Sequence, residues 1–219
     1  MARSTSASAP HKVKRRYGDV WLRHPQEQRP VRTLYLVRHG HYVYTGERGL
    51  SPLGIRQVKR LARRLAKEKF DIIHYSTIQR AMETSLLISG HHPDASVRPS
   101  TLLWEVHPPF FKPRRPKKHE RERYEQVRAQ MKEDEARLEK VYERFLSPVK
   151  SDRTELLVCH GNIIRSLVVK VLGVKRQERA PILTRNTGLT EIRIWADGWP
   201  LLCRYDDIGH LTPAMTSVS

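Results

Sequence analysis

Two histidines occupy positions in the sequence where side chains can do chemistry. His39 follows the apolar run 33–37, His160 follows the apolar run 155–159, and each histidine is followed by a glycine. Short apolar runs of this kind are typical of buried strands. In α/β sheets, ligands bind just beyond the carboxyl ends of strands, and a glycine there lets backbone amides approach an anion. Two such strand ends could bring both histidines into one anion-binding pocket, although a single histidine at a strand end is more often a structural or surface residue.

Three further residues join these histidines only when the set is considered together. Arg38 precedes His39, Arg80 lies near the start of a predicted helix, and Glu105 follows the apolar triplet 102–104. Taken singly, each would be read as an ordinary solvated side chain, because charged residues are mostly exposed. Their occurrence together, in order and in matching contexts, favours a catalytic site.

The segments that must position these residues alternate between strand-like and helix-like patterns. Strands are predicted at 33–37, 71–75, 155–159, 190–195 and 201–205, and helices at 52–69, 77–89, 121–146 and 163–172. Ser51 and Pro52 suit the N-cap and first position of the first helix. Alternation of this kind predicts an α/β fold, a three-layer α/β/α sandwich with a mostly parallel central sheet.

The length of 219 residues suffices for one such domain. We divide the chain into a basic N-terminal arm at 1–30, a catalytic domain at 31–213 and a tail at 214–219. A basic loop and the long charged helix form the segment 106–150 within the domain. The arm has no acidic residue before Asp19, so it is either a solvated basic tail or a mitochondrial transit peptide.

The net charge of +18 favours polyanionic partners such as phosphoproteins, nucleic acids or anionic lipids. The stretch Lys112 to Arg123 holds seven Lys and Arg residues, and it is either a rim that steers an acidic phosphoprotein or a solvated insertion. No nucleic-acid-binding motif is recognised, so we expect no specific nucleic-acid partner. No apolar stretch approaches the roughly 20 residues that a membrane-spanning helix needs.

Metal chemistry has no support in the sequence. Cys159 and Cys203 form no C-x-x-C pair, which argues against a zinc site. His91 and His92 show no ligand spacing, and we expect them to be solvated.

As an ordered set, the motifs resemble the histidine phosphatase superfamily, which includes the phosphoglycerate mutases. The matching blocks are Arg38-His39-Gly40, residues 76–84 with Arg80, Glu105, and residues 159–165 with His160 and Asn162. The resemblance spans residues 33–213. Softer matches at 41–54, 135–139 and 206–213 favour the branch of mitochondrial serine/threonine-protein phosphatases. The resemblance to the superfamily implies a phosphoglycerate mutase-like fold.

The resemblance also implies how the covalent chemistry is shared. His39 would attack phosphorus and become a phosphohistidine, which replaces one difficult transfer by two easier ones. Glu105 would protonate the leaving oxygen and then activate the water that frees His39.

The remaining residues would hold the phosphoryl group. The guanidinium forks of Arg38 and Arg80 match phosphate geometry, His160 would donate to the equatorial oxygens as a catalytic residue, and Asn162 would help to bind phosphate. Because the protein itself supplies the positive charge, we expect neither a metal nor a cofactor.

The substrate is less closely defined. Phosphoglycerate mutases carry a Trp-Asn pair soon after the histidine triplet, but residues 42–46 contain none, which favours hydrolysis of phosphoserine or phosphothreonine in proteins. The alternatives are a phosphatase or mutase for a small phosphorylated metabolite, and a non-catalytic binding module.

Location and assembly rest on the same resemblance. We expect a mitochondrial or else a cytoplasmic location, and a homodimer or higher oligomer. Better-known members of the branch carry a membrane segment and a tryptophan–aspartate-rich assembly motif. Asp19-Val20-Trp21 matches at most a fragment of that motif, and no membrane segment is recognised.

Overall fold

The computed structural model of the chain describes residues 30–44, 48–107, 118–174 and 182–219. A six-stranded sheet forms the middle layer, in the order β3-β2-β4-β1-β5-β6. The strands are β1 (Val31–Arg38), β2 (Ile72–Tyr75), β3 (Ser96–Pro99), β4 (Arg153–Cys159), β5 (Leu189–Trp195) and β6 (Pro200–Asp207). The helices are α1 (Pro52–Leu65), α2 (Gln79–Ser89), α3 (Lys118–Phe145) and α4 (Gly161–Val171), with single turns η3 (Thr101–Leu103) and η4 (Pro213–Met215).

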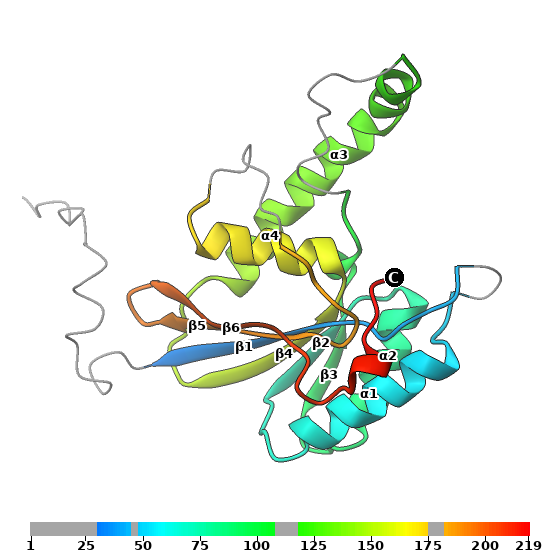
Figure 1. Cartoon of the computed structure of the whole chain (residues 1–219). Coiled ribbons are helices and arrows are strands. Elements are labelled where there is room, and N and C mark those ends of the chain that lie inside the picture. The colour runs from blue at the N-terminus through cyan, green and yellow to red at the C-terminus, as the bar shows by residue number, and fades with distance from the viewer. Residues whose placement is uncertain (1–29, 45–47, 108–117, 175–181) are drawn as a thin grey trace, which may run out of the picture.

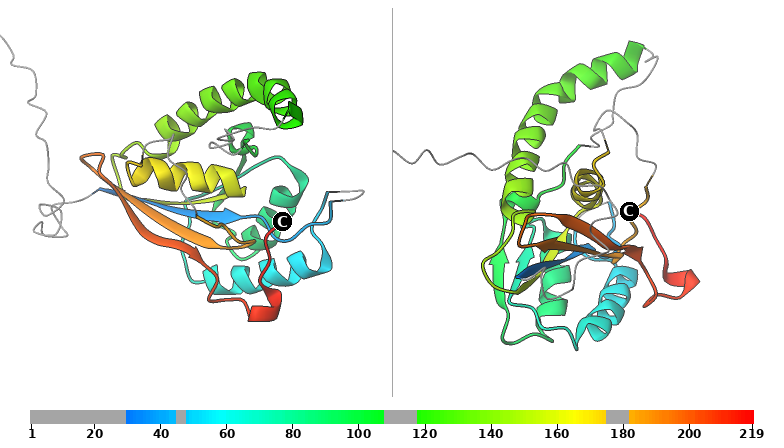
Figure 2. Two further views of the ribbon diagram at one scale, coloured as in Figure 1. Left: turned by 45° about the horizontal axis from the view of Figure 1, so that its top comes forward. Right: turned by 90° about the vertical axis from the view of Figure 1, so that its left-hand side faces the viewer.

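The sheet is mostly parallel, as the sequence predicted. Strand β4 pairs in parallel with both β1 and β2, and β2 pairs in parallel with β3, whereas β5 runs antiparallel to β1 and β6. Helices α1 and α2 cover one face and α3 and α4 cover the other, which gives the three-layer α/β/α arrangement (Figure 1, Figure 2). In the β1–β4 register, Arg38 lies opposite Cys159. The residues that follow these two strands therefore emerge side by side.

Helix α1 forms where the sequence places a cap and an apolar stripe. The hydroxyl of Ser51 accepts a hydrogen bond from the Gly54 amide, and Pro52 occupies the first turn. The stripe Val58, Leu61 and Leu65 is buried against the sheet together with residues of α2. Burial of each such side chain contributes about 1.5–3 kcal/mol, so the first layer is anchored by apolar packing.

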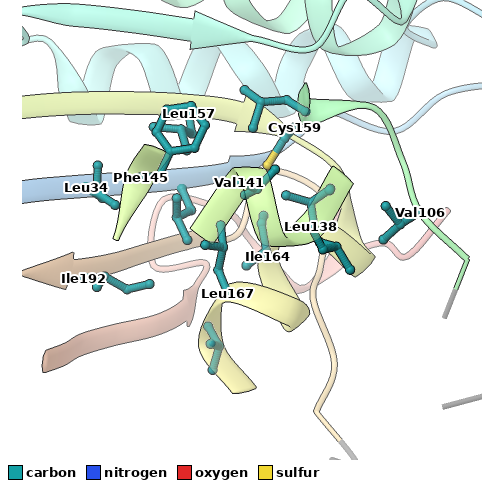
Figure 3. Packing of buried hydrophobic residues seen from close by; sticks show 14 of the residues in the cluster. Leu34, Val106, Leu138, Val141, Phe145, Leu157, Cys159, Ile164, Leu167 and Ile192 are labelled. Carbon is teal, nitrogen blue, oxygen red and sulfur yellow. The ribbon is translucent and has the colours of Figure 1, made fainter. Parts of the chain in front are cut away.

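The opposite face of the sheet is covered through the C-terminal half of α3. Leu138, Val141 and Phe145 pack with Ile164 and Leu167 of α4 over β1 and β4 (Figure 3). The N-terminal part of α3 extends away from the sheet (Figure 1, Figure 2). Of the basic stretch 112–123, residues 112–117 lie outside the described residues, and 118–123 form the first turns of α3.

Several details differ from the sequence-based expectation. Strand β3 was not predicted, because all four of its residues are exposed at the sheet edge and form no apolar run. His92, expected to be solvated, is instead buried with its ring edge-on to Phe70 at 4.9 Å between centroids. Packing on an apolar neighbour explains this, since the pattern His-His says nothing about burial.

Two expectations concern the N-terminal arm and helices that could cross a membrane. Residues 1–29, which include the fragment Asp19-Val20-Trp21, lie outside the described residues. Within the described part of the chain, no helix is both long and apolar enough to cross a membrane.

Candidate active site

The two strand-end histidines meet at the carboxyl ends of β1 and β4. The His39 amide donates a hydrogen bond to the Cys159 carbonyl at 3.0 Å, which continues the pairing of the two strands past their ends. The imidazole centroids of His39 and His160 are 5.1 Å apart, and both side chains are fully enclosed. The parallel register of neighbouring strands therefore creates the pair.

Arg80, in the first turn of α2, bridges the two rings. Its Nε lies 2.9 Å from Nε2 of His39, and one terminal nitrogen lies 3.2 Å from Nδ1 of His160. A guanidinium only donates hydrogen bonds, so both of these ring nitrogens must accept. Arg80 is therefore held on the lone pairs of both histidines.

The neighbours of His39 define its tautomer. Its Nδ1 lies 2.8 Å from the Gly40 carbonyl, which only accepts, so Nδ1 carries the hydrogen and Nε2 carries the lone pair. Burial first, and then the nearby His160 and Arg80, lower the pKa of His39 well below its ordinary value. A neutral imidazole can act as a nucleophile through its Nε2 lone pair once the hydrogen bond from Arg80 is released.

His160 has the opposite tautomer. Because its Nδ1 accepts from Arg80, its Nε2 carries the hydrogen and donates to the Ser76 hydroxyl at 2.8 Å. Burial, Arg80 and Arg38 lower the pKa of His160 well below its ordinary value. His160 can therefore donate from Nδ1 to a phosphoryl oxygen only after its protonation changes. Ser76 lies in a motif block that the sequence singled out, although no role could be assigned to it there.

Two positively charged groups, Arg38 and Arg80, lie in the site. Arg38 is buried, and one terminal nitrogen donates to the Thr184 carbonyl at 2.5 Å, while its Nε is buried without a hydrogen-bond partner among the described residues. Burial lowers the pKa values of both Arg38 and Arg80, as expected for buried cations that form no ion pair among the described residues. The ring of Tyr42 supports Arg80, with the guanidinium carbon 4.5 Å from the ring centroid.

Glu105 enters the site on the loop after η3. Its Oε1 accepts from the backbone amides of Val106 at 3.1 Å and Asn162 at 3.2 Å, so the proton of the neutral acid would lie on Oε2. Burial raises the pKa of Glu105 above its ordinary value, against the lowering effect of the Val106 amide and Arg38. A carboxyl group that holds its proton more strongly is suited to act as a general acid.

Asn162 has a contact that the sequence did not indicate. Its Nδ2 donates to the Val106 carbonyl at 2.9 Å, and its Oδ1 accepts from Arg165 at 3.3 Å. The Asn162 side chain, expected on phosphate, thus joins α4 to the loop that carries Glu105. In this structure it helps to hold the loop that carries Glu105.

The structure thus brings together all six residues that the sequence selected, in one cluster with two cations, two neutral imidazoles, one carboxyl group and one carboxamide. Such a cluster can bind a phosphoryl group and exchange it with a histidine. Among the described residues, no group of three or more His, Cys, Asp and Glu side chains could hold a metal ion.

Comparison with known proteins identifies the family. The family model described as the histidine phosphatase superfamily, branch 1, matches residues 34–207. The chain belongs to this superfamily. This membership agrees with the fold and with the two histidines at adjacent strand ends, and it supports phosphatase chemistry.

Individual relatives differ in the substrates that their names give. The mitochondrial serine/threonine-protein phosphatase Pgam5 of Caenorhabditis elegans is 33% identical over 190 residues, which cover 84% of this chain and 65% of the relative. A Hydrogenobacter thermophilus protein provisionally named phosphoserine phosphatase 2 is 31% identical over 192 residues, which cover 75% of this chain and 90% of that protein. This chain therefore matches somewhat less than two thirds of the length of the Pgam5 relative.

A solved structure supports the fold assignment. The phosphoserine phosphatase of Entamoeba histolytica, crystallised with 3-phosphoglyceric acid, superposes with a TM-score of 0.58 at 22% identity. The superposition covers 83% of this chain and 100% of that one. At this identity the likeness concerns the fold alone.

Proposed function

We propose that the chain is a metal-independent phosphatase that hydrolyses phosphoserine and phosphothreonine in proteins through a phosphohistidine on His39. The observation that carries this proposal is the position of Arg80, whose guanidinium contacts the accepting nitrogens of both His39 and His160. A phosphate anion would draw this guanidinium onto its oxygens, because charge-assisted hydrogen bonds to an anion are stronger than those to a neutral imidazole. The lone pair of His39 would then face phosphorus.

The first step forms one bond and breaks another. Nε2 of His39 attacks phosphorus, the bond to the serine or threonine oxygen breaks, and Glu105 gives its proton to that oxygen. Arg38 and Arg80 neutralise the charge on the equatorial oxygens, where it concentrates in the transition state. These two cations supply the positive charge that a metal ion supplies in other phosphatases.

The second step regenerates the enzyme. Glu105, now ionised, takes a proton from water as the water oxygen attacks phosphorus. The bond to Nε2 of His39 breaks, and inorganic phosphate leaves. The same carboxyl group thus acts first as acid and then as base.

A protein substrate is supported by charge and by relatives. The exposed face of α1 carries Arg56, Lys59, Arg60 and Arg63, and the helix contains no acidic residue. Basic groups at i and i+4 on one helix repel each other and destabilise the helix by about a few tenths of a kcal/mol per pair. An acidic partner bound to this face would remove that repulsion. The Pgam5 relative, named as a protein phosphatase, supports the same substrate class, and its mitochondrial name supports that location for this chain.

The test is turnover with and without His39. We expect p-nitrophenyl phosphate and a phosphoserine peptide to be hydrolysed in the presence of EDTA, and ³²P to be trapped on the protein in acid-labile form. His39→Ala should abolish turnover and labelling. The exposed His91 provides the matched control, because His91→Ala should change neither. Full activity in the His39→Ala protein would disprove the proposed nucleophile.

A small phosphorylated metabolite is the second candidate substrate, favoured by the match to the Hydrogenobacter protein. Comparison of kcat/KM for phosphoserine, 3-phosphoglycerate and phosphopeptides with acidic flanks separates the two. For a protein phosphatase, the acidic peptides should give the highest kcat/KM, and added salt should lower it because salt screens exposed charges. A higher kcat/KM for free phosphoserine would favour the metabolite.

A further inference from the structure

Two buried carboxamides lie on either side of the nucleophile loop, the segment His39–His41. Oε1 of Gln57, on α1, accepts a hydrogen bond from the His41 backbone amide at 2.9 Å. Asn186, on the loop before β5, donates from Nδ2 to the His39 carbonyl at 3.1 Å. Neither side chain is exposed to solvent. The backbone on both sides of the proposed nucleophile is therefore held by amide side chains.

The same two amides bind the C-terminal segment, defined here as residues 215–219. Nε2 of Gln57 donates to the Met215 carbonyl at 2.6 Å and to the Ser217 hydroxyl at 2.8 Å. Nδ2 of Asn186 also donates to the Ser219 hydroxyl at 3.0 Å.

Asn186 makes further bonds to this segment. Its Oδ1 accepts hydrogen bonds from the hydroxyls of Ser217 and Ser219, at 3.0 and 3.3 Å. The backbone N–H of Asn186 donates to the Ser217 carbonyl at 3.0 Å. The segment runs from η4, beside α1, back toward the edge of the sheet where β1 ends (Figure 1, Figure 2). Each amide thus has one contact on the nucleophile loop and the others on the segment.

The loop that carries Asn186 is itself held in an unusual conformation. Thr187 has a φ of 58°, a left-handed conformation that is a genuine outlier for a β-branched residue. Its amide donates to the Arg38 carbonyl at 3.0 Å, and its hydroxyl contacts His210 at 3.1 Å. Strained backbone of this kind persists only where the surroundings impose it, and it is concentrated at functional sites.

From these contacts we infer that Gln57 and Asn186 are positioning residues that couple the C-terminal segment to the backbone of His39, so that this segment controls the placement of the nucleophile. The inference rests on the proposed function, in that it takes His39 as the attacking group. Without the segment, buried amide donors and acceptors would lose their partners, at about 1–3 kcal/mol for each group left unsatisfied. Rotation of the amides to find new partners would shift the His39 carbonyl or the His41 amide.

The predicted effect is on kcat more than on KM. Displacement of a reacting atom by about 1 Å can cost about a hundredfold in rate. Among the described residues, neither Arg38 nor Arg80 has a side-chain hydrogen bond to the segment, so phosphate affinity should change less. A ligand or a modification that pulls residues 215–219 away would therefore slow the enzyme without blocking its pocket.

The experiment removes the segment and then only its hydroxyls. Deletion of residues 214–219 should lower kcat for p-nitrophenyl phosphate by about tenfold to a hundredfold, and a synthetic peptide of residues 213–219 should restore part of it. The full-length double variant Ser217→Ala, Ser219→Ala should show a smaller loss in the same direction. The exposed Val218 gives the matched control, since Val218→Ala should leave kcat unchanged.

Hydrogen–deuterium exchange provides a readout that does not need activity. In the deletion and in Asn186→Ala, residues 39–44 within the peptide that covers 36–44 should exchange faster while the strands of the sheet remain protected. If the wild-type protein hydrolyses no phosphoester but this local change appears, the proposed function fails and the coupling stands. The coupling is wrong if exchange at 36–44 is unchanged and kcat stays within twofold. It is also wrong if exchange rises throughout the domain, since the segment would then serve general stability.

Discussion

The Nε–H of Arg80 donates to Nε2 of His39 at 2.9 Å, and Nε2 is the nitrogen whose lone pair attacks phosphorus in the proposed reaction. The proposed nucleophile is therefore engaged by the group that should bind its substrate. The Nε2 lone pair of His39 becomes free when an anion binds the Arg80 guanidinium more strongly than the His39 imidazole does. In the proposed reaction, Arg80 would thus link phosphate binding to activation of His39.

Arg80→Lys tests this link. An ammonium group cannot reproduce the fork that reaches both imidazoles and two phosphoryl oxygens. We expect kcat/KM for p-nitrophenyl phosphate to fall by about 10²–10³-fold, the usual effect of losing one aligned donor to a transition state. Steady-state kinetics measures this. The exposed Arg98, which bonds Ser96 within β3, provides the control, because Arg98→Lys should have no effect. Equal losses in both variants would contradict the assignment.

Glu105→Gln should separate the two steps of the proposed reaction. A serine alkoxide is a poor leaving group and needs the proton of Glu105, whereas p-nitrophenolate leaves without it. Turnover of a phosphoserine peptide should therefore fall by about 10²–10⁴-fold. With p-nitrophenyl phosphate the first step should remain fast and hydrolysis of the phosphohistidine should become slow. Rapid mixing should then show a burst of nitrophenol equal to the enzyme concentration. Equal slowing on both substrates without a burst would exclude the acid–base role.

The pH profile follows from the directions of the two pKa shifts. The lowered pKa of His39 keeps the nucleophile neutral, and thus active, below the pH at which an ordinary histidine becomes protonated. The raised pKa of Glu105 keeps the acid protonated above the pH at which an ordinary glutamic acid ionises. We expect a bell-shaped profile of kcat/KM for the phosphoserine peptide with its optimum on the acid side of neutrality. A profile that rises steadily toward alkaline pH would contradict both assignments.

Much of the site was predictable because its residues follow strong local signals. His39 and His160 stand after apolar, β-rich runs, and parallel pairing of neighbouring strands places such ends together. The order of the motif blocks gave Arg38, Arg80 and Glu105. The fold followed from the alternation of strand and helix patterns, which is the most reliable sequence signal.

The contacts that were missed depend on tertiary packing. Asn186 reaches His39 across 147 sequence positions, and nothing in its neighbourhood marks it as part of a site. Gln57 would be read as a polar residue on an amphipathic helix, yet it is fully buried. Strand β3 carries no alternation because it lies exposed at an edge. Such features are fixed by which elements meet, and no single segment contains that information.

A buried ion pair outside the catalytic cluster should govern acid stability. Glu155 of β4 pairs with Arg32 at 2.5 Å and accepts from His74 at 3.3 Å, and all three side chains are buried. Burial alone would raise the pKa of Glu155, but the hydrogen bonds from His74 and Arg32 outweigh it and lower the pKa to about 2. A lowered carboxyl pKa stabilises the fold above the unfolded value of about 4.3, and this stability is lost as the pH falls toward 2.

Glu155→Gln should therefore cost about 3–5 kcal/mol at neutral pH, because it leaves the buried Arg32 without its counter-charge. Denaturant unfolding between pH 2 and 7 measures both effects. The wild-type protein should lose about 3 kcal/mol across the window from pH 4.3 to 2, and the variant should lack this part of the pH dependence. Glu143→Gln, on the exposed side of α3, should change stability by less than about 0.5 kcal/mol. A mild effect at Glu155 would show that the pair is dispensable.

Gly54 provides the last prediction, because its position tests whether α1 supports the nucleophile loop. A Cβ at Gly54 would lie 2.0 Å from the His41 carbonyl oxygen, which accepts the Ser51 amide at 3.0 Å. Helix propensity alone would make Gly54→Ala stabilising by about 1 kcal/mol. We expect the clash to outweigh that gain, so that the variant loses stability and also activity as His41 moves.

Gly90→Ala is the matched control, since its Cβ would meet only a backbone oxygen at 3.8 Å and its φ is −58°. That change should leave activity intact and stabilise the protein by about 0.4–1 kcal/mol. Thermal unfolding measures the stability of both variants, and kcat measures their activity. If Gly54→Ala is as active and as stable as Gly90→Ala, α1 does not constrain the nucleophile loop through this contact.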